Sequence, residues 1–244
     1  MRALLLVLLL WPGLAAAGAW PRPAGEVYLS TGQEFGPDGW SGLYAEVGGP
    51  RALTFGFDAG GHVASGLQAY RTGLTAAPEV DGRLTAFVRI PLRPAVLAER
   101  YPSWVAALEF GLGADWETGS DADGATLDLA PRGRVGLSVG RGFSTRWGDG
   151  WVNVDARVEP GGAATRAGLG VVTGIRPRER LTVEMGLFAE REGDASTVTL
   201  APTVQYAVPR LGDVRLGVSV GTGGDARLRL GLSRTFQLRP RGGG

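Results

Sequence analysis

Near its C-terminus the chain reads Ala226-Arg227-Leu228-Arg229-Leu230-Gly231-Leu232-Ser233-Arg234-Thr235-Phe236, in which apolar and polar side chains alternate. Successive side chains of a β-strand point to opposite faces, so a period of two predicts a strand. One face is apolar except for Arg234, and the other carries Arg, Gly, Ser and Thr. This strand therefore separates an apolar environment from a polar one.

Segments of roughly ten residues with the same alternation recur along the chain, separated by turn-forming residues, as is typical of a transmembrane β-barrel. The strands are predicted at residues 26–33, 40–48, 52–60, 83–92, 104–116, 130–140, 151–159, 166–175, 181–191, 198–206, 214–222 and 226–236. Nearly every charged side chain within them falls on one face; Val152 and Val154, for example, alternate with Asn153 and Asp155. The predicted fold class is all-β, an antiparallel up-and-down transmembrane β-barrel of about 12 strands.

The final strand, with its alternating apolar residues and Phe236 close to the end, resembles the C-terminal strand of bacterial outer-membrane β-barrel proteins. The resemblance implies a location in the outer membrane of a Gram-negative cell, among outer-membrane lipid and lipopolysaccharide. It also implies that the barrel-assembly machinery recognises this strand. Arg234 and the tail 237–244 depart from the strictly terminal Phe of the family pattern.

Composition excludes several classes of site and partner. The 244 residues carry a formal net charge of +1, which gives no reason to expect nucleic-acid binding. Cysteine is absent, so disulfides, thiolate metal sites and cysteine nucleophiles are impossible. The chain contains no lysine either, and its 25 Lys and Arg positions are all arginine. The length suits a single barrel domain, and we expect a monomer.

The first 17 residues have the features of a secretory signal peptide. Arg2 precedes an apolar run at 3–11, and Ala15-Ala16-Ala17 supplies small residues at the cleavage site. Cleavage is predicted after Ala17, with a second option after Ala19, which leaves residues 18–244 as the outer-membrane barrel domain. The apolar run is shorter than the ~18 residues that a spanning helix needs.

Alternation alone does not decide which face of the barrel points outward. A soluble barrel buries the Leu and Val face, whereas an outer-membrane barrel turns it to lipid. The polar face combines Gly with Arg, Asp and Glu, and aromatic residues lie at strand ends, and both features favour the membrane. The residues predicted to line the barrel interior, the lumen, are Glu46, Asp58, Arg89, Glu109, Asp115, Arg132, Arg134, Asp155, Arg157, Arg166, Glu184, Arg215, Arg227 and Arg229. The predicted aromatic girdles consist of Trp40, Trp104, Trp116, Phe143, Trp151, Tyr206 and Phe236.

The lengths of the connections predict the topology. With the N-terminus in the periplasm, the two longest connections, 61–82 and 117–129, lie outside the cell, as in outer-membrane barrels. Closure of the barrel places the last strand beside the first, so we expect Arg227 or Arg229 to approach Glu26. We also expect the lumen charges to be segregated, with arginines of the later strands facing acidic residues of the earlier ones.

Two main functions are compatible with this barrel. A charged, Gly-rich lumen suits a narrow channel for small polar or charged solutes; alternatively, the same charges form a paired network that plugs a structural or surface-interaction barrel. A lipid-modifying enzyme is a minor alternative. It rests on His62 and Ser65, since outer-membrane phospholipases and lipid A deacylases use a Ser-His pair, but these residues lack a nucleophile context. We therefore expect no catalytic residue.

The stretch Asp121-Ala122-Asp123-Gly124 resembles a fragment of a calcium loop. Such a loop also needs a bidentate Glu further along the chain, and this Glu is missing. We expect no metal site and no cofactor.

Overall fold

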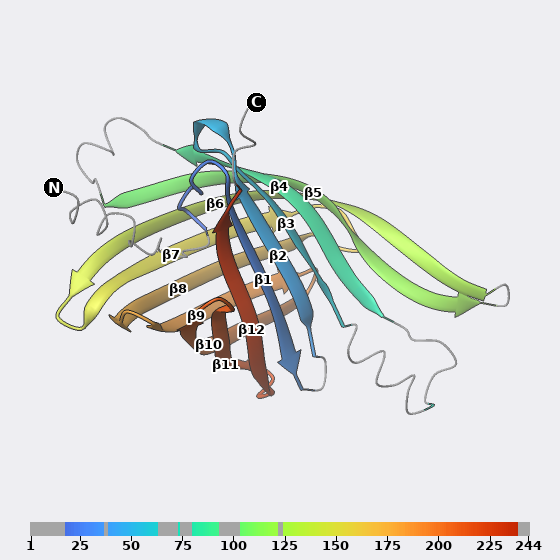
Figure 1. The fold of residues 1–244 in the computed structure, drawn as a ribbon. Helices are drawn as coiled ribbons and strands as arrows, with labels where there is room; N and C mark the ends of the chain where they lie inside the picture. The colour runs from blue at the N-terminus through green and yellow to red at the C-terminus, as the bar shows by residue number, and fades with distance from the viewer. Residues whose placement is uncertain are drawn as a thin grey trace.

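The computed structural model describes residues 18–36, 39–62, 73, 80–92, 103–121 and 124–238. In this part of the chain, twelve antiparallel β-strands close into a single barrel (Figure 1). Each strand pairs with its neighbours in sequence, and β1 closes the barrel against β12. The prediction of an all-β, antiparallel up-and-down barrel of 12 strands is confirmed.

The strands vary in length from 8 to 22 residues. In chain order they are β1 (Glu26–Phe35), β2 (Ser41–Gly48), β3 (Thr54–Gly61), β4 (Asp81–Leu92), β5 (Trp104–Asp121), β6 (Gly124–Thr145), β7 (Gly148–Glu159), β8 (Arg166–Arg178), β9 (Leu181–Glu192), β10 (Ala195–Val208), β11 (Gly212–Gly221) and β12 (Ala226–Gln237). A short 3₁₀ turn, Pro50–Ala52, connects β2 to β3. No described helix is long and apolar enough to cross a bilayer.

The main departure from the predicted strand limits is the hairpin of β5 and β6. Residues 117–129 were expected to form a loop, but the two strands pair up to Asp121 and Gly124. The period of two does continue here, since Leu127 and Leu129 alternate with Thr126 and Asp128. The composition of this stretch, which is rich in acidic residues, is typical of a loop, although the hydrogen-bonded ladder continues through it. Likewise, β6 and β7 extend to a tight turn at residues 146–147.

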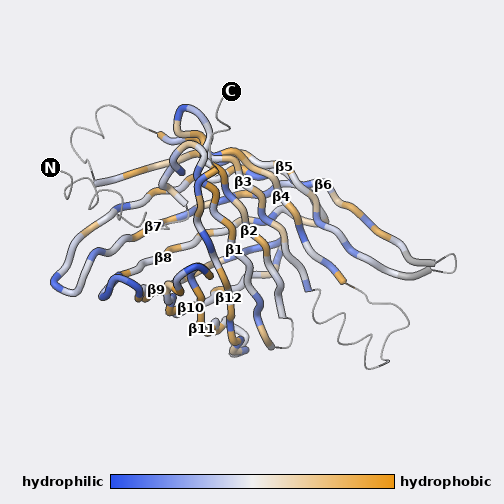
Figure 2. The backbone as a smooth tube through the Cα atoms, in the orientation of Figure 1, coloured by the Kyte–Doolittle hydropathy of each residue, from blue (hydrophilic) through white to orange (hydrophobic). Residues whose placement is uncertain are grey.

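The barrel is apolar outside and polar inside. Leu228 and Leu230 of β12 are 46% and 43% exposed on the outer face, whereas Ser233 on the inner face is 2% exposed. Figure 2 shows apolar and polar positions alternating along the strands. A soluble protein buries its apolar face, so the opposite arrangement is the one expected of a barrel surrounded by lipid.

The two ends of the barrel differ in what they carry. β1 begins and β12 ends at the same end, which we call the termini end. The opposite end, which we call the loop end, carries the connection between β3 and β4 and the long β5–β6 hairpin (Figure 1). The two ends define positions along the barrel axis.

Candidate functional site

A network of ion pairs crosses the barrel interior from β2 to β6. Arg89 on β4 donates to Glu46 at 2.5 Å and to Glu109 at 2.9 Å. Arg134 on β6 lies 3.6 Å from the same Glu109 and 3.1 Å from Asp58 on β3. Because β3 and β6 are not neighbours in the sheet, the contact between Arg134 and Asp58 spans the space inside the barrel.

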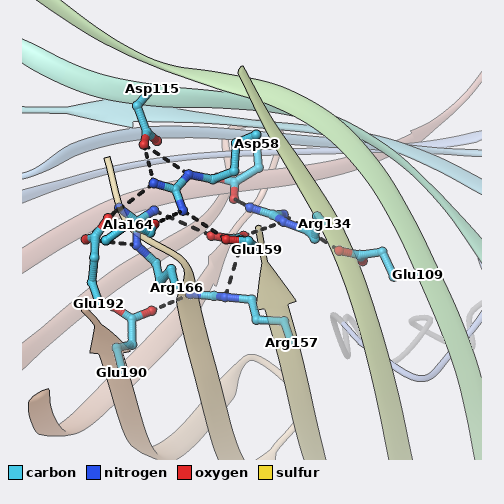
Figure 3. A network of polar contacts seen from close by, with 11 residues as sticks. Asp58, Glu109, Asp115, Arg134, Arg157, Glu159, Ala164, Arg166, Glu190 and Glu192 are labelled. Carbon is cyan, nitrogen blue, oxygen red and sulfur yellow. Dashed lines mark hydrogen bonds and ion pairs between the residues drawn. The ribbon is translucent and has the colours of Figure 1, made fainter. Parts of the chain in front are cut away.

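The network continues on β6 to β9, toward the loop end (Figure 3). Glu159 is 1% exposed and accepts from Arg134 at 2.6 Å and from Arg166 at 3.4 Å. Arg166 also pairs with Glu192 at 2.9 Å. Arg132 binds Asp115 and Glu192, and donates to the backbone oxygens of Glu159 and Ala164. Arg157 pairs with Glu190. Each guanidinium serves two or more acceptors, which fixes the strands relative to one another.

The remaining strands, β10 to β12 and β1, carry fewer charges. Arg215 on β11 pairs with Glu184 on β9 at 3.0 Å. Glu34 at the end of β1 lies 3.0 Å from Arg229 and 3.7 Å from Arg227. The expectation that Arg227 or Arg229 approaches Glu26 is therefore wrong. In an antiparallel pair, the start of β12 lies beside the end of β1, whereas Glu26 begins β1 and faces Gln237.

The expected segregation of charge across the lumen is also wrong. Arg132 and Arg134 contact Asp115 and Asp58 directly, so acidic and basic groups are interleaved. The sequence pattern places each side chain on a face but does not specify how far it reaches across the interior. Long arginine side chains on β6 extend to carboxylates several strands away, and this neutralises the field that a segregated wall would produce.

Most of the predicted lumen residues are thus brought together. A single network holds Glu46, Asp58, Arg89, Glu109, Asp115, Arg132, Arg134, Arg157 and Arg166; Glu184 with Arg215, and Arg227 with Arg229, form the two separate groups described above. Sequence reasoning missed Arg22, Glu34, Glu159, Glu190 and Glu192 as partners. For Glu159 and Glu190 the signal was available, because each continues the polar alternation of its strand.

Asp155 on β7 is not part of the ion-pair network. It accepts hydrogen bonds from the Ser138 hydroxyl and from the Asn153 amide. Among the described residues it forms no ion pair with an arginine. A carboxylate that is held only by neutral donors in a polar interior retains capacity for a cation.

Two of the seven aromatic residues predicted for the girdles lie inside the barrel. Trp151 is 4% exposed and covers Gly174, where any side chain would overlap the indole ring. Trp40 lies under the guanidinium of Arg83, 4.9 Å from its ring centroid, and edge-on to His62. The aromatic pattern marked most strand ends, although Trp116 lies within β5, five residues before its end. It could not distinguish lumen from lipid, because a ring near a strand end fits either side.

Four of the other five predicted girdle residues, Trp104, Phe143, Tyr206 and Phe236, lie on the outer face of their strands and are 37% to 50% exposed. Trp116 packs over Gly82 and borders the outer-mouth cavity. Their position at the membrane boundary remains a prediction.

His62 is paired with Asp81, whose carboxylate lies 2.9 Å from Nδ1. Ser65, its predicted neighbour in a possible Ser-His pair, lies outside the described residues, as do Ala122 and Asp123 of the calcium-loop fragment. Within the described part of the chain, no group of three or more His, Cys, Asp or Glu side chains is placed to hold a metal ion.

Three cavities follow one another along the barrel. The outer-mouth cavity at the loop end has a volume of about 1330 Å³ and is bordered by Glu34, Trp40 and Arg229. These residues also border the central cavity of about 420 Å³. The central cavity shares Trp151 and Glu184 with the inner-mouth cavity of about 430 Å³ at the termini end. Shared lining residues make the three spaces consecutive, with Trp151 and Glu184 at the boundary between the last two.

A fourth space, the side cavity of about 310 Å³, lies within the ion-pair network. It is lined by Gly18, Arg89, Glu109, Arg134 and Asp155, among others. It shares Tyr28, Asp58 and Asp155 with the central cavity, so it branches from the central cavity into the ion-pair network.

Comparisons with known proteins identify the fold. No protein-family model and no curated protein sequence matches the chain. Among solved structures, it is similar to a KdgM porin in complex with disordered oligogalacturonate, with a TM-score of 0.57 and 10% sequence identity over 86% of this chain and 99% of that one. A second KdgM porin structure matches over the same shares at 10% identity, with a TM-score of 0.54. The chain thus has the fold of bacterial outer-membrane β-barrels.

Proposed function

We propose that the protein is an outer-membrane channel for small polar or charged solutes. The observation that carries the proposal is the row of three cavities from one end of the barrel to the other. A twelve-stranded barrel is wider than eight-stranded barrels, which are filled by side chains, and narrower than sixteen-stranded aqueous porins. The porin fold supports the same proposal.

The charges inside the barrel suggest which solutes would pass. Most described inward arginines are paired with carboxylates, so the wall offers no continuous track of one sign. Solute contacts are instead provided by uncharged residues of the central cavity, such as Ser30, Thr203 and Trp151. The ion pair of Glu184 and Arg215 adds one group of each charge. This lining favours small polar molecules, including zwitterions, over long polyanions or polycations.

The proposal includes the cellular setting. Secretion after cleavage at Ala17 and recognition of β12 by the barrel-assembly machinery would deliver a monomeric barrel to the outer membrane. There the apolar outer face would contact outer-membrane lipid and lipopolysaccharide.

Conductance of the purified mature protein in a planar lipid bilayer tests the channel function. We expect discrete, small current steps, since the large Trp151 ring and the Glu184 side chain lie where the central and inner-mouth cavities meet. The control is Trp151→Ala, which widens this boundary and should increase the step size. A folded protein that gives no steps, with or without Trp151→Ala, would contradict the channel function.

A plugged structural barrel is the second candidate, and the network itself favours it. The contact between Arg134 and Asp58 crosses the interior, and buried ion pairs of this kind rigidify a barrel as well as line it. Under this alternative, replacing lumen charges alters thermal stability and leaves the bilayer silent.

A further inference from the structure

The chain segment that precedes β1 crosses the interior of the barrel near the termini end. Arg22 is 6% exposed and lies beside β1, β2 and β3: it donates to Glu46 at 2.6 Å and, through its backbone N–H, to Thr54 at 3.1 Å. Ala19 is completely buried and donates its backbone N–H to Asn153 on β7 at 3.2 Å. Since β7 lies opposite β1 in the strand order, residues 19–22 reach from one wall to the other.

Both walls are shaped to receive this segment. On β6, a side chain at Gly140 would overlap the Trp20 ring, and on β2 a side chain at Gly48 would overlap the backbone of Pro23. Burial lowers the pKa of the Arg22 guanidinium, but the Glu46 and Glu26 carboxylates raise it more, so the net shift is upward and the anchor stays charged. The segment is therefore fixed in the barrel at its Arg22 end.

Gly18 marks the other end of the segment. Its φ of +107° disfavours any other residue, and a Cβ there would overlap the Asn153 side chain. Gly18 lines the side cavity together with Asp155, and Asn153 touches both residues. Asp155 is an inward carboxylate that makes no ion pair with an arginine among the described residues.

From this arrangement we propose that removal of the signal peptide after Ala17 completes an ion pair: the new α-ammonium group of Gly18 binds Asp155 and latches the segment across the lumen. Hydrolysis of the Ala17–Gly18 peptide bond by signal peptidase leaves a carboxylate on Ala17 and an amine on Gly18, which takes up a proton at neutral pH. The latch rests on the predicted cleavage site and is independent of whether the barrel conducts.

The physical reason for the latch is that Asp155 makes no ion pair with any described residue. Burying a carboxylate without an ion-pair partner costs free energy, and a nearby ammonium group with free donors offsets that cost. Before cleavage, the nitrogen of Gly18 is a neutral amide and cannot do so. Removal of the signal peptide would thus allow residues 18–22 to be fixed in their final position inside the barrel.

The absence of lysine makes the latch directly measurable, because the α-amine is the only primary amine of the mature chain. The first measurement is the rate at which an amine-reactive acetylating reagent modifies the folded mature protein in detergent. We expect slow modification of the wild type, and a rate at least about tenfold higher in Asp155→Asn, corresponding to the loss of about 1.4 kcal/mol of pairing. Asp81→Asn, at the loop end, is the matched control and should label as slowly as the wild type.

A thermodynamic cycle covers the case in which Asp155→Asn folds poorly. The unfolded chain is acetylated at its single amine, refolded, and compared with unmodified protein by its thermal unfolding midpoint. Acetylation should lower the midpoint of the wild type and leave that of Asp155→Asn unchanged. Three results would each overturn the proposal: a mature chain that begins at Trp20 by mass spectrometry, wild-type labelling as fast as in the unfolded state, or equal effects of acetylation on both proteins.

Discussion

The inner wall of the barrel has two unlike parts. The charge-rich arc, from β2 to β9, holds the connected network around Arg89, Arg134 and Glu159. The sparse arc, from β10 through β12 to β1, carries fewer charges. Besides Arg215, its part of the central cavity is lined mainly by small side chains, among them Ser30, Thr203 and Gly217.

The difference between the arcs indicates that they have different roles. Long paired side chains fill space and tie strands together, whereas Gly, Ser and Thr leave space open. Under the proposed channel function, the charge-rich arc provides stability and the sparse arc provides the passage for solutes. The central cavity lies where small side chains of the sparse arc face the ends of the network.

Replacement of Arg134 should have the largest effect on stability. Arg134→Leu removes one cation from three carboxylates, Asp58, Glu109 and Glu159, and breaking a buried pair in this way costs about 3–5 kcal/mol. Thr203→Val on the sparse arc is the matched control. The Thr203 side chain makes no hydrogen bond to any described residue, so its loss should cost within about 0.5 kcal/mol. Urea unfolding in detergent measures both, and equal losses would remove the distinction between the arcs.

A charge introduced on the outer side of the sparse arc tests which of its side chains point to lipid and which point to the lumen. Leu230→Arg places a guanidinium against lipid, which costs roughly 2–4 kcal/mol near the bilayer midplane. Gly32→Ser, on the adjacent strand, points into the lumen, where an added Cβ meets its first neighbour at 3.5 Å. We expect reduced insertion into lipid vesicles for Leu230→Arg alone. Equal tolerance of both changes would mean that the faces are assigned the wrong way round.

Space in the sparse arc predicts a specific effect on conductance. Thr203→Tyr adds a ring to the central cavity and should reduce the single-channel current severalfold with little loss of stability. Val204→Tyr places the same ring on the outer face, since Val204 is 45% exposed there. Its current should equal that of the wild type; a comparable drop in both variants would indicate a general distortion.

The smallest effect is expected for the charges at the loop end of the sparse arc. Arg229→Glu replaces a partly exposed pair with two neighbouring carboxylates, costs about 1 kcal/mol or less, and should shift ion preference toward cations. The shift should weaken as salt is raised, because the Debye length falls to ~10 Å at 0.1 M. Reversal potentials in a salt gradient measure it, with Arg146→Glu in the exposed β6–β7 turn as control for net charge. A shift in the control of the same size would assign the effect to overall charge.

The sequence determined the architecture to a large extent because a period of two is a local property. All twelve strands were predicted, and β12 alone indicated which residues share a face. Strand limits were less accurate where composition and pairing disagree, as in the β5–β6 hairpin. There, residues such as Glu117 and Asp128 are typical of loops, yet they face each other in the ladder.

The candidate site was less accessible to sequence reasoning. Alternation places Arg134 inside but cannot indicate that its side chain reaches Asp58 on β3, with β4 and β5 lying between them in the sheet. The inward position of Trp151 depends on space above Gly174, and the position of residues 18–23 depends on the closed barrel around them. These features arise from packing between elements that are distant in sequence, which no local pattern encodes.

Thiol accessibility provides the most direct comparison of the two arcs, because the chain has no cysteine of its own. The measurement is the current through single channels of Thr203→Cys and of Ser138→Cys, before and after addition of a charged methanethiosulfonate reagent. Ser138 is 7% exposed and donates to Asp155 in the charge-rich arc. We predict that the reagent reduces the current through Thr203→Cys and leaves Ser138→Cys unaffected. Block of Ser138→Cys alone, or an unchanged current in both, would contradict passage along the sparse arc.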